Sequence, residues 1–163
     1  MSERLWAPWR LQYIQNADVA EGCIFCDKPS EKRDRENLIL HRFETCFVIL
    51  NLFPYVSGHL MVAPFRHLGE LNEMTSEEKL EMIEATDACC RALQAVYRPQ
   101  GFNLGANIGR SAGAGIVGHV HMHIVPRWAG DTNFMSVVGQ TRVLPESLED
   151  TYDKLIEALP NVL

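Results

Sequence analysis

A chain of 163 residues, 47% of them hydrophobic and 22% charged, is typical of one compact soluble domain. The net charge is −6, and no Lys/Arg-rich run offers the cationic face that a sequence-independent nucleic-acid binder needs. No apolar run reaches the length of a membrane span, and the first residues lack the apolar region of a signal peptide. The five cysteines are an odd number, which favours a reduced cytoplasmic protein over a disulfide framework.

The sequence contains no repeat, low-complexity segment or linker, so residues 1–163 are expected to form a single domain. Residues 1–20 are interpreted as an N-terminal arm. Its Trp6, Trp9 and Tyr13 have helix-like spacing, which is typical of packing against the core or against a second subunit. A Cys23-Ile-Phe-Cys26 sequence and a charged loop follow.

Two short apolar runs, at 46–50 and 60–63, are predicted to be strands because Asn51, Pro54 and Gly58 break the chain between them. Thr75 and Glu78 then form the pattern of a capping box, which opens a long helix that ends before Pro99. The face of this helix expected to be buried consists of Met82, Ile83, Cys89, Cys90, Leu93, Val96 and Tyr97.

Residues 102–108 and 119–125 are predicted to be a second strand pair around a glycine-rich loop, with Pro126 ending the last strand. Residues 145–163 show the pattern of a C-terminal helix, with Pro145 in its first turn. The order of strands, helix, strands and helix favours an α+β fold with an antiparallel sheet.

Three histidines alternate with apolar residues in the segment 119–125, and this period of two is typical of a strand. One face of the strand would carry the histidines, and the other would pack against the helices. The histidines are His119, His121 and His123, and the packed residues are Val120, Met122 and Ile124.

Three interpretations fit such a face. It can be an exposed surface without a function, or it can bind a transition metal, since histidines at i and i+2 can ligate zinc. It can also act by nucleophilic catalysis, because a neutral imidazole attacks phosphorus well near pH 7 and the resulting phosphoramidate is labile. Alternate residues of a strand lie about 6.6 Å apart, so three imidazoles do not easily chelate one ion and divided roles are favoured.

A glycine-rich loop, 109–118, leads into the histidine segment. Gly113, Gly115 and Gly118 match the G-x-G-x-x-G spacing of dinucleotide-binding folds, but they open a strand and not a helix, so a Rossmann fold is rejected. Glycine lets the backbone approach an anion closely, and Ser111 adds a hydroxyl. The loop is therefore expected to bind phosphate, with a plain flexible turn as the alternative.

The histidine segment resembles the signature of the histidine-triad (HIT) superfamily, in which three histidines are separated by hydrophobic residues and followed by two more. The resemblance spans nearly the whole chain, including residues 51–64 and 126–131. Residues 5–10, 51–55 and 109–113 are similar to the branch that contains diadenosine tetraphosphate phosphorylases of actinobacteria and fragile-histidine-triad-like proteins.

The resemblance implies an α+β fold, usually a homodimer whose sheet continues across the interface. It also implies that His121 takes the nucleotidyl group in a catalytic centre built from the three triad histidines, and that His123 contacts the α-phosphate. By the same resemblance Asn51 lies near the ribose or phosphates and His59 lies near the triad. Asn107 stands where relatives place a polar side chain near phosphate.

Two departures from the family pattern bear on the activity. Many relatives have a glutamine shortly before the triad that helps to place phosphate and water, whereas this slightly longer loop has Ala114 and Gly115. Phosphate is therefore considered as an acceptor beside water. In the related hexose-phosphate uridylyltransferases the third triad position is glutamine, and His123 argues against that activity.

The Cys23/Cys26 pair can be two buried thiols, a redox pair or half of a metal site, although the strand–helix context of a redox motif is missing. In relatives with this pair, a histidine after the second strand and the first triad histidine complete a zinc site. The matching residues here are His67 and His119, with His41 as a rival third ligand. A closed Cys₂His₂ set indicates structural zinc.

The sequence therefore predicts an enzyme that cleaves a dinucleoside polyphosphate, with diadenosine tetraphosphate as the expected substrate. AMP would be transferred to His121 and then to phosphate or water. Three alternatives stay open: a nucleoside phosphoramidase of the same superfamily, a zinc-dependent hydrolase, and a nucleotide-binding adaptor without turnover.

Overall fold

The computed structural model of the protein describes residues 22–131 and 146–163. The predicted N-terminal arm, with Trp6, Trp9 and Tyr13, lies outside these residues, as does Pro145. Within the described ranges, no helix is both long enough and apolar enough to cross a membrane.

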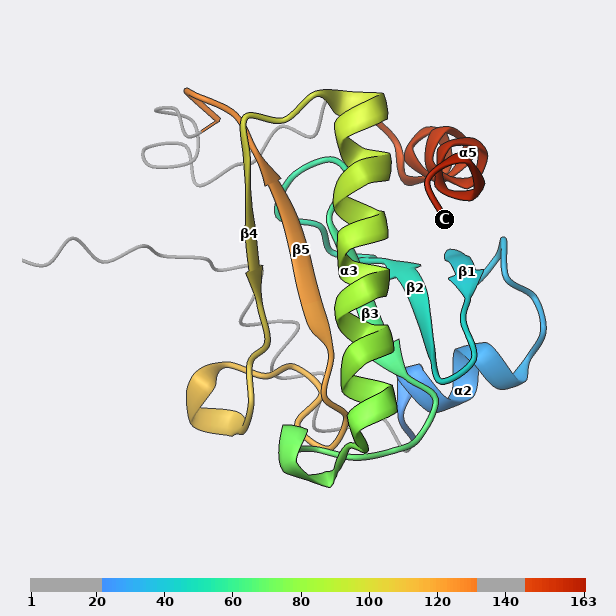
Figure 1. Ribbon diagram of the computed structural model, residues 1–163, viewed down its shortest axis with the longest axis vertical. Helices are drawn as coiled ribbons and strands as arrows, with labels where there is room; N and C mark the ends of the chain where they lie inside the picture. The colour runs from blue at the N-terminus through green and yellow to red at the C-terminus, as the bar shows by residue number, and fades with distance from the viewer. Residues whose placement is uncertain (1–21, 132–145) are drawn as a thin grey trace, which may run out of the picture.

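Five strands form one sheet in the order β1-β2-β3-β5-β4, and every neighbouring pair is antiparallel (Figure 1). This confirms the α+β fold. The strands are β1 (Ile39–Arg42), β2 (Cys46–Leu50), β3 (Leu60–Pro64), β4 (Gly101–Gly105) and β5 (Met122–Arg127). The helices are α2 (Ile24–Ser30), α3 (Ser76–Tyr97) and α5 (Leu148–Ala158), with short 3-10 turns at η1 (Leu71–Glu73), η2 (Arg110–Ala112) and η3 (Leu159–Asn161).

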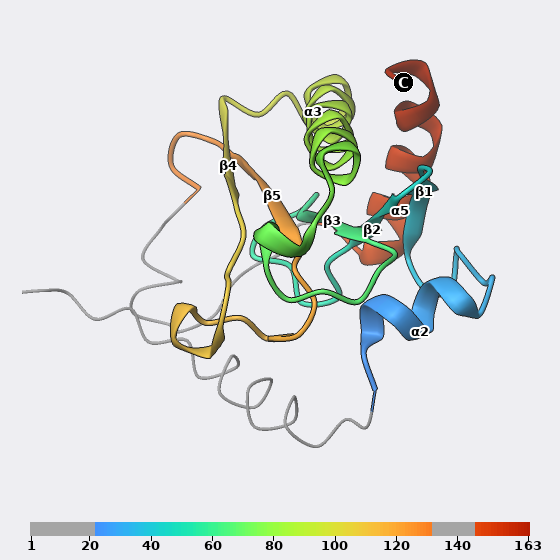
Figure 2. The ribbon, with the colours of Figure 1, turned by 60° about the horizontal axis from the view of Figure 1, so that its bottom comes forward.

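Two hydrophobic cores lie on opposite faces of the sheet, one under α3 and α5 and the other under α2 (Figure 2). Neighbouring residues of the central strands enter different cores: Val48 and Val62 pack on the α3 side, and Phe47 and Ala63 on the α2 side. Because both faces are covered, β2 and β3 are buried along their whole length. This explains why they appear in the sequence as continuous apolar runs.

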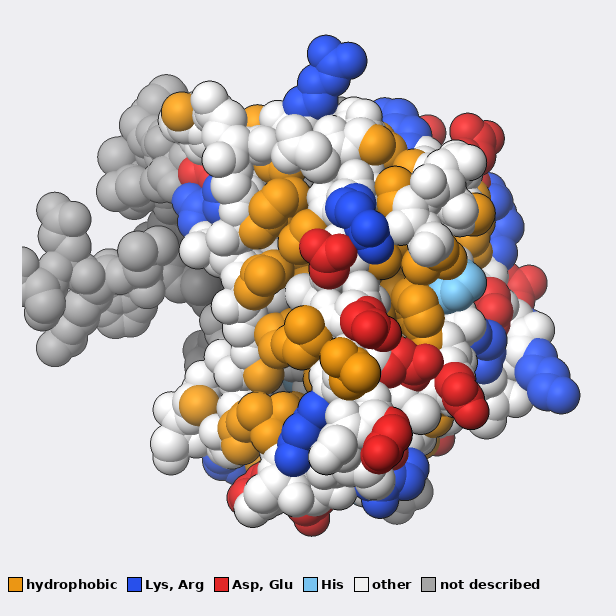
Figure 3. All heavy atoms as spheres, in the orientation of Figure 1, with side chains coloured by type: hydrophobic (Ala, Val, Ile, Leu, Met, Phe, Trp, Pro, Cys, Tyr) orange, Lys and Arg blue, Asp and Glu red, His pale blue; other side chains and the backbone are white. Residues whose placement is uncertain are grey.

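The predicted capping box opens α3. The Thr75 hydroxyl accepts a hydrogen bond from the Glu78 backbone N–H at 3.2 Å, and the Glu78 carboxylate accepts one from the Thr75 backbone N–H at 2.8 Å. The helix ends at Arg98, which adopts a left-handed conformation (φ 48°) just before Pro99. The predicted buried face is confirmed except at Ile83, which is 56% exposed beside Leu80. These two residues lie on the outer face of α3, where Figure 3 shows hydrophobic side chains beside acidic ones.

The predicted strand boundaries need correction at the second pair. Strand β4 ends at Gly105 and not at residue 108, and β5 begins only at Met122. The prediction that Pro126 ends the last strand is wrong, because β5 continues to Arg127 and Pro126 pairs with Phe102. Pairing with β3 stops at Ile124, so Pro126 has a partner strand on one side only, where its missing N–H is tolerated.

Two elements were not expected from the sequence. Strand β1 is four residues long with a break in its register, and α2 is a seven-residue helix with Pro29 inside it. Both are short, and their patterns are weak in isolation. In the tertiary structure α5 covers β1, where the Tyr152 hydroxyl donates to the Ile39 carbonyl at 3.0 Å.

Candidate functional site

The three triad histidines lie on the sheet face opposite α3, at the start of β5. Val120 and Ile124 are buried in the α3-side core and Met122 packs against it, which confirms the predicted alternation. His119 and His121 precede the strand, and His123 pairs with Met61 inside it. The Val120 N–H bonds to the Leu68 carbonyl at 2.8 Å, so residues 119–121 stay extended without joining the ladder.

His121 is held so that one ring nitrogen is free of a proton. It is 4% exposed, and its Nδ1 lies 2.8 Å from the His119 carbonyl oxygen. A carbonyl can only accept, so Nδ1 carries the proton and Nε2 keeps its lone pair. Burial lowers the pKa of His121, although the bond to His119 opposes the shift. The imidazole of His121 is therefore oriented by the backbone carbonyl of His119, with its lone pair on Nε2.

His119 is turned the other way. Its Nε2 lies 2.8 Å from the Pro64 carbonyl, so this nitrogen carries the proton and Nδ1 has the lone pair. Nδ1 points at two sulfur atoms, 3.3 Å from Cys23 Sγ and 3.6 Å from Cys26 Sγ. Burial of the ring lowers the pKa of His119. The neighbouring histidines of the triad thus expose opposite nitrogens.

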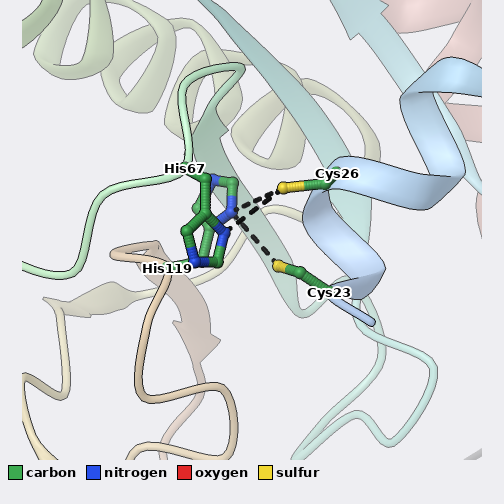
Figure 4. A group of neighbouring side chains, drawn as sticks. All are labelled: Cys23, Cys26, His67 and His119. Atoms are coloured by element: carbon green, nitrogen blue, oxygen red, sulfur yellow. Dashed lines mark hydrogen bonds between the residues drawn. The ribbon is translucent and has the colours of Figure 1, made fainter. Parts of the chain in front are cut away.

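The predicted metal ligands Cys23, Cys26, His67 and His119 come together in one cluster (Figure 4). One donor atom from each lies within 4.8 Å of all the others, and His67 Nδ1 is 3.3 Å from Cys26 Sγ. Burial and the nearby Cys23 raise the pKa of the Cys26 thiol to about 11. His41, the rival ligand, lies in β1 and is not a member of this cluster.

The approach of His67 explains one glycine of the loop. A Cβ atom at Gly118 would lie 3.2 Å from Nε2 of His67, which is tighter than most real contacts. The residue that completes the G-x-G-x-x-G spacing therefore makes room for a cluster histidine. This gives Gly118 a role that differs from the rejected dinucleotide fingerprint.

A chain of hydrogen bonds fixes the third histidine. The Tyr55 N–H donates to His59 Nδ1 at 3.2 Å, and the Asn51 amide lies 3.4 Å from the same nitrogen. Neutral His59 then carries its proton on Nε2, which lies 3.0 Å from His123 Nδ1. His123 Nδ1 is the acceptor, so its own proton sits on Nε2. The prediction that His59 lies near the triad is confirmed, and Tyr55, which the sequence interpretation missed, begins the chain.

Phe25 is a second residue that the sequence interpretation missed. It lies between the two cysteines in α2, is 1% exposed, and packs against the rings of both His119 and His121. Its position inside the Cys-x-x-Cys sequence was a weak signal, because Ile24, the other apolar residue between the two cysteines, is 36% exposed.

The remaining predicted substrate contacts lie in the loops after β2 and β4. Asn51 follows β2, and its side-chain oxygen accepts the Phe53 N–H at 2.9 Å. Asn107 is half-buried after β4, and Ser111 is exposed in η2. Gly113 ends that turn with φ 85°, a conformation that favours glycine, and Gly115 is half-buried in the same loop.

Comparison with known proteins agrees with this arrangement. Residues 32–130 match the HIT domain, so the chain belongs to the HIT family. It is 39% identical over 156 residues to AP-4-A phosphorylase of Mycobacterium tuberculosis, an alignment that covers 91% of this chain and 80% of the relative.

Two solved structures share the fold. One is a Zn-bound histidine triad family protein from Mycobacterium smegmatis, with a TM-score of 0.70 and 26% identity, covering 86% of this chain and 94% of that one. The other is a hypothetical histidine triad nucleotide-binding protein from Sulfolobus tokodaii, with a TM-score of 0.68 and 26% identity, covering 85% and 93%.

Proposed function

We propose that the protein cleaves dinucleoside polyphosphates, with diadenosine tetraphosphate as substrate, through a nucleotidyl group carried transiently on His121. The observation that carries this proposal is the orientation of His121, whose Nδ1 proton is donated to the His119 carbonyl and whose Nε2 lone pair is left for attack. The 39% identity to a protein named AP-4-A phosphorylase supports the choice of substrate.

In the first step, His121 Nε2 forms a bond to the α-phosphorus and the bridging P–O bond breaks. AMP stays on His121, and the rest of the substrate leaves as ATP. In the second step the oxygen of phosphate or water attacks the same phosphorus, the P–N bond breaks, and ADP or AMP is released. Splitting the transfer in this way replaces one difficult displacement by two easier ones.

His123 is assigned to the α-phosphate. Since His59 fixes the proton of His123 on Nε2, that nitrogen is a hydrogen-bond donor for charge that develops on the phosphoryl oxygens. The rings of His121 and His123 lie 4.8 Å apart in an edge-on arrangement, close enough to serve one phosphoryl group.

Substrate contacts are proposed for the surrounding loops. Asn51 is placed near the ribose or phosphates and Asn107 near phosphate. In the loop that contains Ser111, Gly113 and Gly115, the Gly113 N–H donates to the Arg110 carbonyl at 3.0 Å. The Ser111 hydroxyl is therefore the group proposed to contact an anion, and the glycines let the backbone approach it closely. The loop has no glutamine before the triad to position water, which favours phosphate as the acceptor.

The Cys23/Cys26/His67/His119 cluster is proposed to hold a structural zinc ion. Two thiols and two imidazoles are the donor set that zinc prefers, and their donor atoms lie close enough to surround one ion. A bound ion would join α2 to the segments before α3 and β5. Four protein ligands leave no open position for a metal-bound water, so the donor set favours His121 catalysis over a zinc-dependent hydrolase.

A homodimer is proposed to form at β4. Strand β1 is covered by α5, whereas β4 pairs only with β5 among the described strands. Leu104 on β4 is 53% exposed, and Leu80 and Ile83 of α3 are also exposed. An exposed edge strand of this kind can pair with a strand of another chain.

A cytoplasmic location is proposed, because the five free thiols fit a reducing compartment.

The test is a quenched reaction with labelled diadenosine tetraphosphate, followed by mapping of the adduct by mass spectrometry. We expect AMP on His121, no adduct in His121→Asn, and ADP only when phosphate is present. Faster cleavage of a nucleoside phosphoramidate would favour the phosphoramidase alternative. Tight nucleotide binding without product would favour the adaptor, and full activity of His121→Asn would refute the mechanism.

A further inference from the structure

Phe25 holds one face of the His121 ring. The two ring centres lie 4.6 Å apart at an interplanar angle of 36°, and both side chains are almost completely buried. The same phenylalanine lies 5.3 Å from the ring of His119. A tilted contact at this distance is attractive beyond simple burial and restricts rotation of the smaller ring.

The edge of the His121 ring is held by a different group. Its Nδ1 donates to the backbone carbonyl of His119, and His119 is itself a member of the metal cluster. The His123 ring also contacts His121, at 4.8 Å, but the Phe25 ring and the His119 carbonyl both belong to segments that carry donors of the metal cluster. On the α2 side, Phe25 lies between Cys23 and Cys26.

Few other contacts hold α2 in place. The helix has seven residues, and only Phe25 and Pro29 are buried. A helix this short is not stable alone and depends on its tertiary contacts. At the far end Arg42 donates to the Pro29 carbonyl at 2.8 Å and Asn37 donates to the Lys28 carbonyl at 3.2 Å. The end that carries Phe25 is held by packing of Phe25 in the α2-side core and by the two flanking cysteines.

We propose that Phe25 is a positioning residue for His121, and that ligation of the Cys23/Cys26/His67/His119 cluster sets the orientation of the nucleophile through Phe25 and the His119 carbonyl. This inference depends on the proposed function for its catalytic consequence. It adds to that function a structural coupling between the metal cluster and the triad. Loss of the ring contact or of the metal frees His121 to rotate and to move its proton to Nε2.

Long-range ¹H–¹⁵N NMR on zinc-loaded protein with ¹⁵N-labelled histidine measures the tautomer of the His121 ring directly. The chain has six histidines, and His121→Asn assigns the signal. Wild type is expected to show a single Nδ1–H tautomer with a slowly exchanging ring proton. Phe25→Leu is expected to show averaged tautomers and no slow proton. Phe25→Met, whose flexible side chain fills irregular gaps in a core, serves if the leucine variant does not fold.

Phe47→Leu is the matched control. Phe47 is fully buried in the same core and lies 6.5 Å from Phe25, but it makes no ring contact with the triad among the described residues. Its substitution removes the same number of atoms and is expected to leave the His121 tautomer unchanged. An unchanged His121 signal in Phe25→Leu, or an equal loss in Phe47→Leu, would overturn the proposal.

Removal and return of Zn²⁺ tests whether ligation of the metal cluster sets the orientation of His121. In the metal-free wild type the Nδ1–H signal of His121 should disappear and should return with Zn²⁺, while His41 in β1 keeps its signal. Loss at His41 as well would mean that the metal holds the whole fold, and it would overturn the specific coupling.

Kinetics complete the test with diadenosine tetraphosphate as substrate. A misplaced nucleophile should lower kcat by up to about 10²-fold at unchanged KM, since small displacements cost this much. Phe47→Leu should keep kcat. If His121→Asn retained activity, the proposed function would fail while the NMR result would still decide whether Phe25 orients His121.

Discussion

Replacing His59 by phenylalanine tests the hydrogen-bond chain that fixes His123. The ring of His59 is fully buried, and its two nitrogens join the Tyr55 N–H to His123 Nδ1 at 3.2 and 3.0 Å. Phenylalanine has a similar shape but neither accepts nor donates. The Tyr55 N–H and His123 Nδ1, both on half-buried residues, each lose a partner. At about 1–3 kcal/mol for each group, the free energy of unfolding should fall by roughly 2–6 kcal/mol.

The catalytic effect of His59→Phe should be larger than its effect on binding. Without His59 the proton of His123 is no longer fixed on Nε2. Loss of one positioned donor to a developing charge costs about 10²–10³-fold in kcat, which is the upper limit expected here. Steady-state kinetics and urea unfolding measure the two quantities. His59→Gln, which keeps one donor and one acceptor, should lie between the variant and wild type.

The matched control is His41→Phe, the same substitution at a half-buried position of β1 where the ring contacts Phe43. It should change the free energy of unfolding by less than about 0.5 kcal/mol and leave kcat unaltered. If His59→Phe matched this control in both measurements, the reasoning from Tyr55 through His59 to His123 would be refuted.

Three shorter predictions follow. Cys26→Ser should lose most of the bound zinc, measured by atomic absorption, and its Tm should fall by roughly 2–4 °C for each kcal/mol of stability lost. The control Cys90→Ser on α3 should keep its zinc. Equal zinc in both variants would contradict the proposed ligand set. Bonds from Arg66 lower the pKa of Glu78 from 4.5 to about 2, so its stabilisation is complete above pH 4.5 and lost as pH falls toward 2. Glu78→Gln should lower the free energy of unfolding by about 1–2 kcal/mol near neutral pH and should flatten its dependence on pH in the acid range. An unchanged pH dependence would contradict the role given to Glu78. Light scattering should show the wild type as the proposed dimer and Leu104→Lys as a monomer, and an equal mass for both would argue against the β4 interface.

Local sequence patterns determined the elements with strong periodicity. The capping box at Thr75, the apolar run at 46–50 and the alternation across His119–Val125 each specify a local conformation through neighbours a few residues apart. The same alternation predicted the triad, whereas the Cys-x-x-Cys spacing alone left a metal site open and the resemblance to the HIT family added His67 and His119 as expected ligands. Helix α2 and strand β1 escaped prediction because elements this short are stable only through contacts with distant parts of the chain.

The tertiary structure decided which nitrogen His119 and His123 expose, whereas His121 is oriented by the His119 carbonyl two residues away. His119 faces the cysteines because Pro64, 55 residues away in sequence, accepts its other proton, and His123 owes its orientation to His59, 64 residues away. No local pattern encodes such partners, since a tautomer depends on the groups that meet the ring in space. The sequence supplies three similar imidazoles, and the packing of β3, α2 and the loops around them makes their chemistry different.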